Sequence, residues 1–311
     1  MKKKVVVTGN FPLPLDIGAE FSICHIPSPS SYEDILIHLA DAWGYVLGGP
    51  EYLSKYVLKS APKLKNVVVM GTGTPSFVDL SAASLLGVNV YNTPHINAAA
   101  VAEFGIATII SCLAGIYSSI DGVRDGTSWQ QSPRLSLKNA NILLVGAGEI
   151  GSQLIRTLRL LGAKNIKYFS RTRKQKLETE FSPAFVPLAE GLAWADLASI
   201  QVTYNVESHG LIADDMFAAA NPNLRLINFS NPAVVDPAAL RRWLLLHEQA
   251  FAFIDGYYRE WTANHGLKND SYELLSLPRR KFVATSHIAA QEQEAIKDIL
   301  FIAFSKLRSQ Q

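Results

Sequence analysis

The stretch NILLVGAGEIGSQLIRTLRLLGAKNIKYFSRTRK, residues 141–174, decides the fold of its half of the chain. It opens with a short apolar run, 142–145, which predicts a buried parallel strand. Glycines follow in the G-x-G-x-x-G spacing, which permits a sharp strand-to-helix turn and close approach of a pyrophosphate to the backbone and to the helix N-terminus. The predicted cofactor contacts in this turn are Gly146, Gly148, Glu149, Ile150 and Gly151. The alternative is a glycine-rich turn of some other α/β protein.

The end of the next strand, predicted at 166–169, indicates which dinucleotide is bound. A protein that prefers NAD usually places Asp or Glu there, where the carboxylate binds the adenine ribose. This chain instead has Ser170, Arg171, Thr172 and Arg173. A hydroxyl followed by cations favours the additional phosphate of NADP, so we predict NADP(H) over NAD(H). The alternative is that these arginines are ordinary solvated surface residues.

Composition excludes several classes of partner. The 311 residues suffice for two domains, and with 48% hydrophobic residues and a net charge of +2 we expect neither a nucleic-acid nor a membrane partner. Cys24 and Cys112 lack the spacing of a metal site, so we expect reduced thiols, no metal and a cytoplasmic protein. The apolar run in MKKKVVV stops after three residues and predicts a first strand rather than a signal peptide.

Strands and helices alternate through the rest of the chain. Predicted strands at 4–8, 45–47, 67–70 and 89–91 give about the first 95 residues a β/α domain of their own. Its glycine-rich loop 71–74 follows a strand, where open α/β sheets place ligands, although a plain turn is the alternative. One long helix is predicted from Ala98 to Tyr117 or beyond. Asp236 followed by Pro237 predicts a helix start.

Several separated motifs resemble the D-2-hydroxyacid dehydrogenase family, from about Lys63 to Ala295. They are GTGTPSFVD (71–79), NTPHINAAAVAE (92–103), R-x-G-x-x-W (124–129), the glycine spacing, LINFSNPAVVDPAAL (226–240), and the segments around Glu260 and His287. The resemblance implies two doubly wound parallel-sheet α/β domains flanking a cleft. These would be a flavodoxin-like substrate domain (1–97 and 288–311) and a Rossmann cofactor domain (98–287), whose long helix forms a homodimer.

The resemblance also implies a chemistry for a small-molecule substrate. His287 would protonate the carbonyl oxygen as hydride arrives, and Glu260 would orient the imidazole and raise its pKa. Taken alone, each of these side chains is more often an ordinary core or surface residue. Asp236 is most simply a helix cap. Further implied contacts are Thr203 with the cofactor, and Gly71, Thr72, Gly73, His95 and Tyr258 with the substrate.

The chain departs from the family pattern where the family carries its arginine. In the family, an arginine in an Ala-Arg-Gly sequence completes the catalytic set with the histidine and the glutamate. This chain has Ser230, Asn231 and Pro232 there, so Asn231 occupies the arginine's position and carries no charge. Other changes are Gln201, Thr203, Ser286, His95 and Trp261. We favour a reductase whose substrate is not a simple 2-oxo acid, with Tyr257, Tyr258 and Trp261 lining a larger pocket. The alternative is a dinucleotide-sensing regulatory protein with little or no catalysis.

Overall fold

The computed structural model describes residues 2–124, 126, 134–258 and 270–311. They divide into two compact units. Unit 1 holds the described residues up to 97 and from 291 onward, and unit 2 holds those between. The domain boundaries predicted from the sequence, 97/98 and 287/288, stay a prediction.

Unit 1 is built on a sheet of five parallel strands in the order β2-β1-β3-β4-β5. The strands are β1 (Lys4–Thr8), β2 (Ser22–Ile26), β3 (Gly44–Leu47), β4 (Asn66–Val69) and β5 (Asn89–Asn92). This is the strand order of flavodoxin-like folds. Strand β2 was not predicted, because at the edge of the sheet most of its residues stay partly exposed and it lacks a continuous apolar run.

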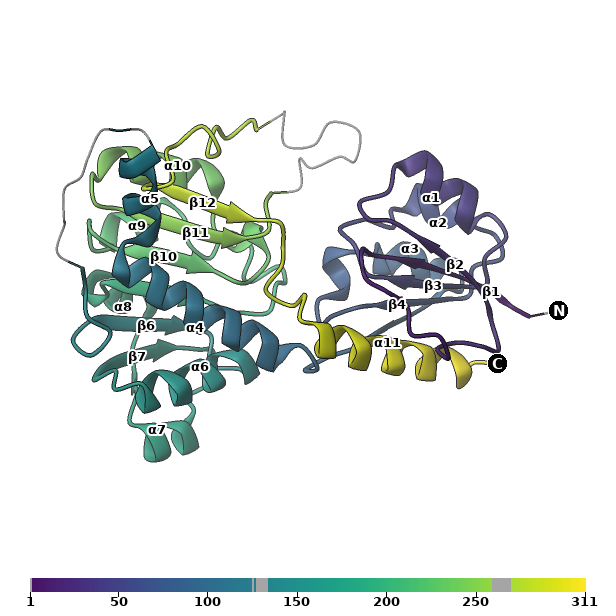
Figure 1. The fold of residues 1–311 in the computed structure, drawn as a ribbon, viewed down its shortest axis with the longest axis horizontal. Coiled ribbons are helices and arrows are strands. Elements are labelled where there is room, and N and C mark those ends of the chain that lie inside the picture. The colour runs from purple at the N-terminus through teal and green to yellow at the C-terminus, as the bar shows by residue number, and fades with distance from the viewer. Residues whose placement is uncertain (1, 125, 127–133, 259–269) are drawn as a thin grey trace. The chain divides into compact units, whose positions relative to one another are not determined.

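Helices cover both faces of this sheet (Figure 1). They are α1 (Tyr32–Leu39), α2 (Lys55–Lys59), α3 (Leu80–Leu85) and α11 (Gln293–Arg308), with a short 3-10 helix η1 (Thr74–Ser76). Because side chains alternate along a strand, Val6 packs in the core with α1, α2 and α3, whereas Val5 and Val7 pack with Leu300 and Phe304 of α11. The unit is therefore doubly wound, and its last helix comes from the C-terminal end of the described chain.

Unit 2 contains seven parallel strands in the order β12-β11-β10-β9-β6-β7-β8. The strands are β6 (Asn141–Val145), β7 (Asn165–Phe169), β8 (Ala184–Phe185), β9 (Leu197–Ile200), β10 (Arg225–Asn228), β11 (Phe251–Asp255) and β12 (Phe282–Thr285). From the central strand β6 the sheet grows through β7 to β8 in one direction. The chain then returns, and β9 to β12 extend the sheet from the other edge of β6. This is the Rossmann order extended by one strand, and the predicted fold class is confirmed.

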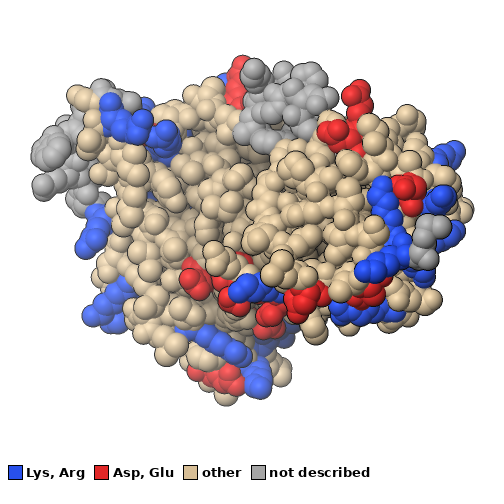
Figure 2. Space-filling model, turned by 45° about the vertical axis from the view of Figure 1, so that its right-hand side comes forward, with Lys and Arg blue, Asp and Glu red and all other residues tan. Residues whose placement is uncertain are grey.

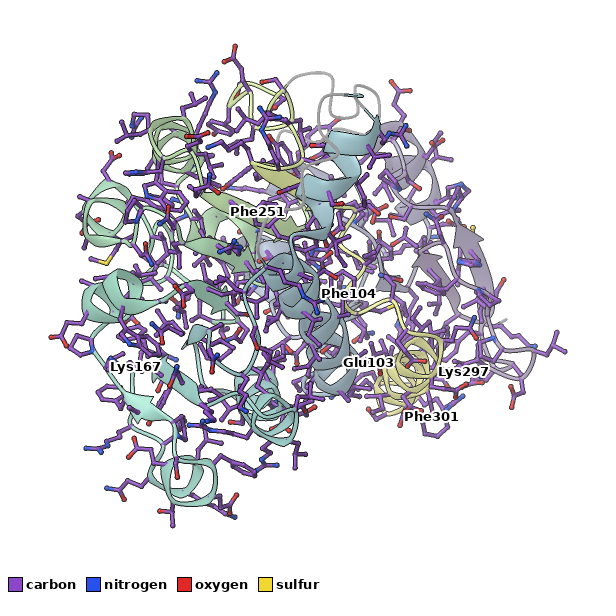
Figure 3. The ribbon with its side chains drawn as sticks, turned by 60° about the vertical axis from the view of Figure 1, so that its left-hand side comes forward. Glu103, Phe104, Lys167, Phe251, Lys297 and Phe301 are labelled. Carbon is purple, nitrogen blue, oxygen red and sulfur yellow. The ribbon has the colours of Figure 1, made fainter. Side chains whose placement is uncertain are left out.

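The helices of unit 2 form two layers (Figure 1). They are α4 (Ala98–Ala114), α5 (Ile116–Arg124), α6 (Glu149–Leu160), α7 (Gln175–Phe181), α8 (Leu188–Trp194), α9 (Asp214–Ala219) and α10 (Pro237–Leu246), with a 3-10 helix η2 (Pro232–Val234). One core cluster joins the sheet to α8, α9 and α10, and the other joins it to α4, α6 and α7. On α4 (Figure 3), Phe104 meets Phe229 and Phe253 with ring centroids 6.0 and 6.2 Å apart.

The single long helix predicted from Ala98 onward is wrong. Gly115, with φ +69°, ends α4, and α5 leaves at a bend of 58°. Two short helices, α7 and α9, were also missed, because each buries a single apolar side chain, Leu177 and Phe217 respectively, and so shows no apolar period. Within the described residues no single helix is long and apolar enough to cross a membrane. Only α4 and α5, taken together across their bend, have the required length and hydropathy.

Candidate active site

Two glycines of the turn after β6 are required by the packing of unit 2 itself. Gly146 has φ +105°, and a Cβ there would lie 2.8 Å from the backbone oxygen of Gln201. A Cβ at Gly151 would lie 2.0 Å from the carbonyl oxygen of Gly146. Because side chains cannot fit at either position, these two residues bring the first turn of α6 against the end of β6.

Gly148 is different. It is the N-cap residue of α6, its φ of −76° suits any residue, and apart from its chain neighbours no atom of the described residues lies within 4 Å of where its Cβ would be. The turn therefore leaves open space beside the backbone at a helix N-terminus, where unpaired N–H groups and the helix dipole attract anions. A pyrophosphate fits this cradle. Of the neighbouring predicted contacts, Glu149 is exposed and accepts a hydrogen bond from Gln153 at 3.2 Å, and Ile150 packs partly against the core.

The end of β7 carries the residues predicted to choose between the two dinucleotides. The hydroxyl of Ser170 donates to the carbonyl oxygen of Thr172 at 2.6 Å. Arg171 lies 3.4 Å from Glu207, and both side chains are 76% exposed. Arg173 donates to both oxygens of Glu178 at 3.0 Å.

The two arginines are therefore not equivalent. Arg173 and the hydroxyl of Tyr168 lower the pKa of Glu178 by hydrogen bonding, so this carboxylate keeps its charge and holds the guanidinium of Arg173. The exposed pair made by Arg171 is a weak one, because solvent screens both charges. In Figure 2 basic and acidic side chains both lie mainly toward the margins of the visible face, and neither kind gathers into one large patch, in line with the net charge of +2.

Asn231 lies in a turn that follows β10. Its side-chain oxygen accepts a hydrogen bond from the backbone of Ala233 at 3.0 Å and so caps η2. The buried Asn228 braces the same turn, because it accepts from the backbone N–H of Ser230 at 2.8 Å. The hydroxyl of Ser230 donates to the carbonyl oxygen of Val202 at 2.8 Å. The asparagine that stands where the family has an arginine thus lies in a turn held by several polar hydrogen bonds.

His287 lies just beyond β12 and adopts an unusual backbone conformation. Its φ is +61°, in the left-handed region that costs a non-glycine residue about 1 to 2 kcal/mol. Its imidazole lies against Gly256, where a Cβ would be 2.9 Å from Nδ1 and 3.6 Å from Cγ of Pro232. The structure therefore brings the predicted histidine and the turn that contains Asn231 to the same glycine. Such strain is typical of functional positions.

Asp255 holds the backbone around His287 in place. It is buried, and one carboxylate oxygen accepts hydrogen bonds from the hydroxyl of Thr285 at 2.6 Å and the N–H of Ile288 at 2.8 Å. The other oxygen accepts from the N–H of Ala289 at 2.9 Å. Sequence reasoning assigned this aspartate no role. An acidic residue at the end of a fully apolar strand was the available signal.

The remaining predicted contacts of unit 2 differ in their placement. Tyr258 is only 6% exposed, and its hydroxyl donates to the carbonyl oxygen of Val235 at 3.0 Å. Burial raises the pKa of Tyr258, whose ring packs in a core cluster of unit 2, and its role as a substrate contact stays a prediction. Thr203 is exposed, and its carbonyl oxygen accepts from Ser208 at 2.9 Å. Glu260 and Trp261 lie outside the described residues.

Asp236 caps a helix, as predicted. Its side chain accepts a hydrogen bond from the N–H of Ala239 at 2.7 Å at the start of α10.

Across the described parts of the chain, no group of three or more His, Cys, Asp or Glu side chains is placed to hold a metal ion.

The glycine-rich loop of unit 1 follows β4. The N–H of Gly71 donates to the hydroxyl of Thr93 at 2.9 Å, and Asn92 donates to the carbonyl oxygen of Thr72 at 2.9 Å. Within the described residues, the N–H groups of Thr72 and Gly73 make no hydrogen bond, and the nearest atom to a Cβ at Gly73 would be 3.7 Å away. His95, farther along, is exposed with φ +71°.

Fold and site together define a two-unit α/β protein that binds a dinucleotide. A family model described as D-isomer specific 2-hydroxyacid dehydrogenase, NAD binding domain, matches residues 106–289. The glyoxylate reductase of Thermococcus litoralis is 31% identical over 252 residues, which cover 78% of this chain and 72% of that protein. The chain therefore belongs to this family of NAD-dependent 2-hydroxyacid dehydrogenases and reductases.

Other relatives and solved structures agree with the family. The D-3-phosphoglycerate dehydrogenase of Sus scrofa is 26% identical over 85% of this chain, which spans only 48% of that protein. The structure of D-lactate dehydrogenase from Aquifex aeolicus, complexed with NAD and lactic acid, covers 98% of this chain and 94% of its own, with a TM-score of 0.80 and 20% identity. Phosphoglycerate oxidoreductase from Vibrio cholerae gives 0.82 at 20% identity, covering 99% and 98%. At such identities these structures show the fold alone.

Proposed function

We propose that the protein is an NADP(H)-dependent oxidoreductase whose substrate is not a simple 2-oxo acid. It transfers hydride between the nicotinamide and the carbonyl or hydroxyl carbon of an organic substrate. The observation that carries the proposal is the placement of His287, whose imidazole lies against Gly256 beside the turn of Asn231 and Pro232, on a backbone pinned by Asp255. A protein that only bound a dinucleotide would have no need to hold an exposed histidine in a strained conformation.

His287 moves the proton. When bound, the cofactor supplies or accepts the hydride. In the reducing direction His287 gives its proton to the oxygen that becomes the hydroxyl, and in the oxidising direction it takes that proton back. Glu260 is assigned to orient the imidazole.

Asn231 sets the class of substrate. An arginine would offer a substrate carboxylate a charged, two-pronged donor, whereas an amide offers hydrogen bonds without charge. Its side-chain oxygen already caps η2. We therefore assign Asn231 to a neutral, or differently placed, polar group of the substrate. In unit 1 we propose that the substrate contacts the N–H groups of Thr72 and Gly73, together with Gly71 and His95.

NADP(H) is proposed because the residues directly after β7 include no carboxylate and Arg171 is exposed. The guanidinium of Arg171 can exchange its solvent-screened contact with Glu207 for a 2′-phosphate, which carries more charge than one carboxylate. Arg173 is less suited, because Glu178 already holds it. Ser170 and Thr172 supply the polar edge of this subsite, and Thr203 remains a proposed contact of the cofactor.

The assembly is proposed to be a homodimer formed through α4 and α5. The exposed apolar residues of these helices support it: they are Ile110, Ile116, Ile120 and Val123. A cytoplasmic location stays a prediction.

A second candidate is a dinucleotide-sensing protein with little or no catalysis. The uncharged Asn231 favours it, because removal of a charged contact to the reacting oxygen weakens transition-state stabilisation by about 2 to 4 kcal/mol.

Absorbance of NADPH, followed with a panel of 2-oxo acids, β-keto compounds, aldehydes and imines, separates the two candidates. Turnover of at least one compound that disappears in His287→Gln supports the enzyme. Tight NADPH binding without turnover of any compound supports the sensor. Turnover that survives His287→Gln contradicts the role given to this histidine.

A further inference from the structure

Gln201 directly follows β9, beside the glycine turn, and its side chain is only 9% exposed. Its amide nitrogen donates to the carbonyl oxygen of Gly146 at 2.8 Å and to that of Val145 at 3.2 Å. Its backbone N–H also donates to the oxygen of Val145, at 2.9 Å. One residue thus binds both peptide groups through which β6 passes into the turn.

A second buried side chain fixes the direction of this amide. The hydroxyl of Ser199, which is fully buried, donates to Oε1 of Gln201 at 2.9 Å. Because Oε1 accepts this hydrogen bond, the nitrogen is the end that faces Gly146. Reversing the amide would turn its oxygen toward the two carbonyl oxygens, so the buried network has one satisfied arrangement.

The carbonyl that Gln201 binds is also the surface on which α6 packs. A Cβ at Gly151 would lie 2.0 Å from the oxygen of Gly146 and 3.3 Å from Nε2 of Gln201. The direction of this carbonyl therefore sets how closely the first turn of α6 approaches β6. The same turn contains Gly148, the N-cap of α6, beside which there is open space, and the unpaired N–H groups of a helix N-terminus follow it.

We propose that Gln201 is a positioning residue for binding of the cofactor's pyrophosphate, and this rests on the dinucleotide binding proposed above. It acts through Gly146 and does not contact the cofactor. By holding that carbonyl against α6, the amide keeps the helix N-terminus in the geometry that accepts phosphate oxygens. The function requires a donor at this position, so an acceptor of the same shape reverses the interaction.

Two isosteric variants test the donor. Gln201→Met removes it while keeping the volume, and Gln201→Glu replaces it with an acceptor when ionised. Dissociation constants for NADPH, NADH and ADP-ribose are measured by titration calorimetry well below the melting temperature of each variant. We expect Gln201→Met to weaken all three by a common factor of about 5 to 10, because the ADP portion is shared and about one buried hydrogen bond is lost.

The pH profile separates positioning from simple packing. Gln201→Glu is expected to bind ADP-ribose more weakly at pH 8 than at pH 5.5, relative to wild type, because a protonated carboxyl regains a donor. If Gln201→Met does not fold, Ser199→Ala takes its place. That variant frees the amide to rotate, with an expected loss of about 2- to 3-fold.

The outcomes are distinguishable. A folded Gln201→Met variant that binds all three ligands like wild type, even with a lower melting temperature, overturns the inference, because Gln201 is then only a core residue. A Gln201→Glu variant whose affinity follows the pH dependence of wild type does the same. Wild-type protein that binds none of the three ligands overturns the proposed function, and the inference falls with it.

Discussion

The imidazole of His287 lies against the α-carbon of Gly256, so closely that a Cβ at that glycine would be 2.9 Å from Nδ1. Gly256 directly follows Asp255, whose carboxylate receives the N–H groups of Ile288 and Ala289. Two consecutive residues at the end of β11 therefore determine where the histidine stands. One shapes the space beside the ring, and the other fixes the backbone that carries it.

Gly256→Ala is expected to lower kcat by about 10- to 100-fold, because displacement of a catalytic group by about 1 Å has effects of this size. Gly256 also has φ +104°, so the variant loses stability as well. Gly162→Ala is the matched control, since Gly162 has φ +93° but, chain neighbours aside, no atom of the described residues lies within 4 Å of the added Cβ. Steady-state kinetics and thermal melting should show both variants destabilised and only Gly256→Ala impaired in kcat. Equal kcat losses would contradict the proposed contact.

Asp255→Asn keeps the shape of the side chain but replaces one acceptor oxygen with a donor. At least one of its three hydrogen-bond donors, at Thr285, Ile288 and Ala289, then loses its partner, which costs about 1 to 3 kcal/mol. We expect a lower kcat with little change in the Kd of NADPH, because the loop that carries His287 loses its fixed geometry. Unchanged kcat, with the expected loss of stability in chemical denaturation, would show that Asp255 supports only the fold.

Arg171→Ala should weaken NADPH binding about 10-fold and leave NADH binding unchanged, since only the 2′-phosphate is lost as a partner. Arg173→Ala is the control. Its guanidinium is bonded to Glu178, so we expect a much smaller effect on the choice of cofactor. Fluorescence titration of both dinucleotides measures each constant. Equal wild-type affinities for NADPH and NADH would refute the preference for NADP(H).

The two cysteines should differ sharply toward a thiol reagent. Burial raises the pKa of Cys112 to about 12, so at pH 8 its thiol remains protonated and enclosed in the native protein. Cys24 is partly exposed, with Sγ 3.4 Å from Nδ1 of His38. Peptide mass spectrometry after brief iodoacetamide treatment should find Cys24 alkylated and Cys112 modified only after unfolding. Rapid modification of native Cys112 would contradict its burial in the core of unit 2.

Local sequence patterns predicted most of the fold. The glycine spacing, the apolar runs of the central strands and the Asp236 cap each lie within a few residues, so the physical cause is visible in the sequence. The break at Gly115 was missed, because a glycine inside an apolar helical pattern does not by itself show that its φ is positive. Edge strand β2 was missed because partial exposure removes the apolar signal.

The site was harder to predict, because its supporting contacts join distant parts of the chain. Asp255 reaches backbone groups 33 and 34 residues away, and Gln201 binds carbonyl oxygens 55 and 56 residues away. Such contacts have no sequence period. The burial of Tyr258 was not predicted either, since the sequence marks it as a large amphipathic side chain but does not show which side of the strand end it packs on.

Asn231→Arg should raise kcat/KM for small 2-oxo acids such as glyoxylate and pyruvate, because the new guanidinium can pair with both the carbonyl oxygen and the carboxylate. The same change removes the cap that Asn231 provides to Ala233, at a cost of about 1 kcal/mol in stability. Asn231→Ala loses the same cap and gains no charge. The kcat/KM of Asn231→Arg divided by that of Asn231→Ala therefore isolates the effect of the cation. We expect this ratio to exceed about 10 for 2-oxo acids and to stay near 1 for uncharged carbonyl compounds. A ratio near 1 for both would mean that the missing arginine does not determine the substrate, and that the changes at Thr203 and Ser286 matter more.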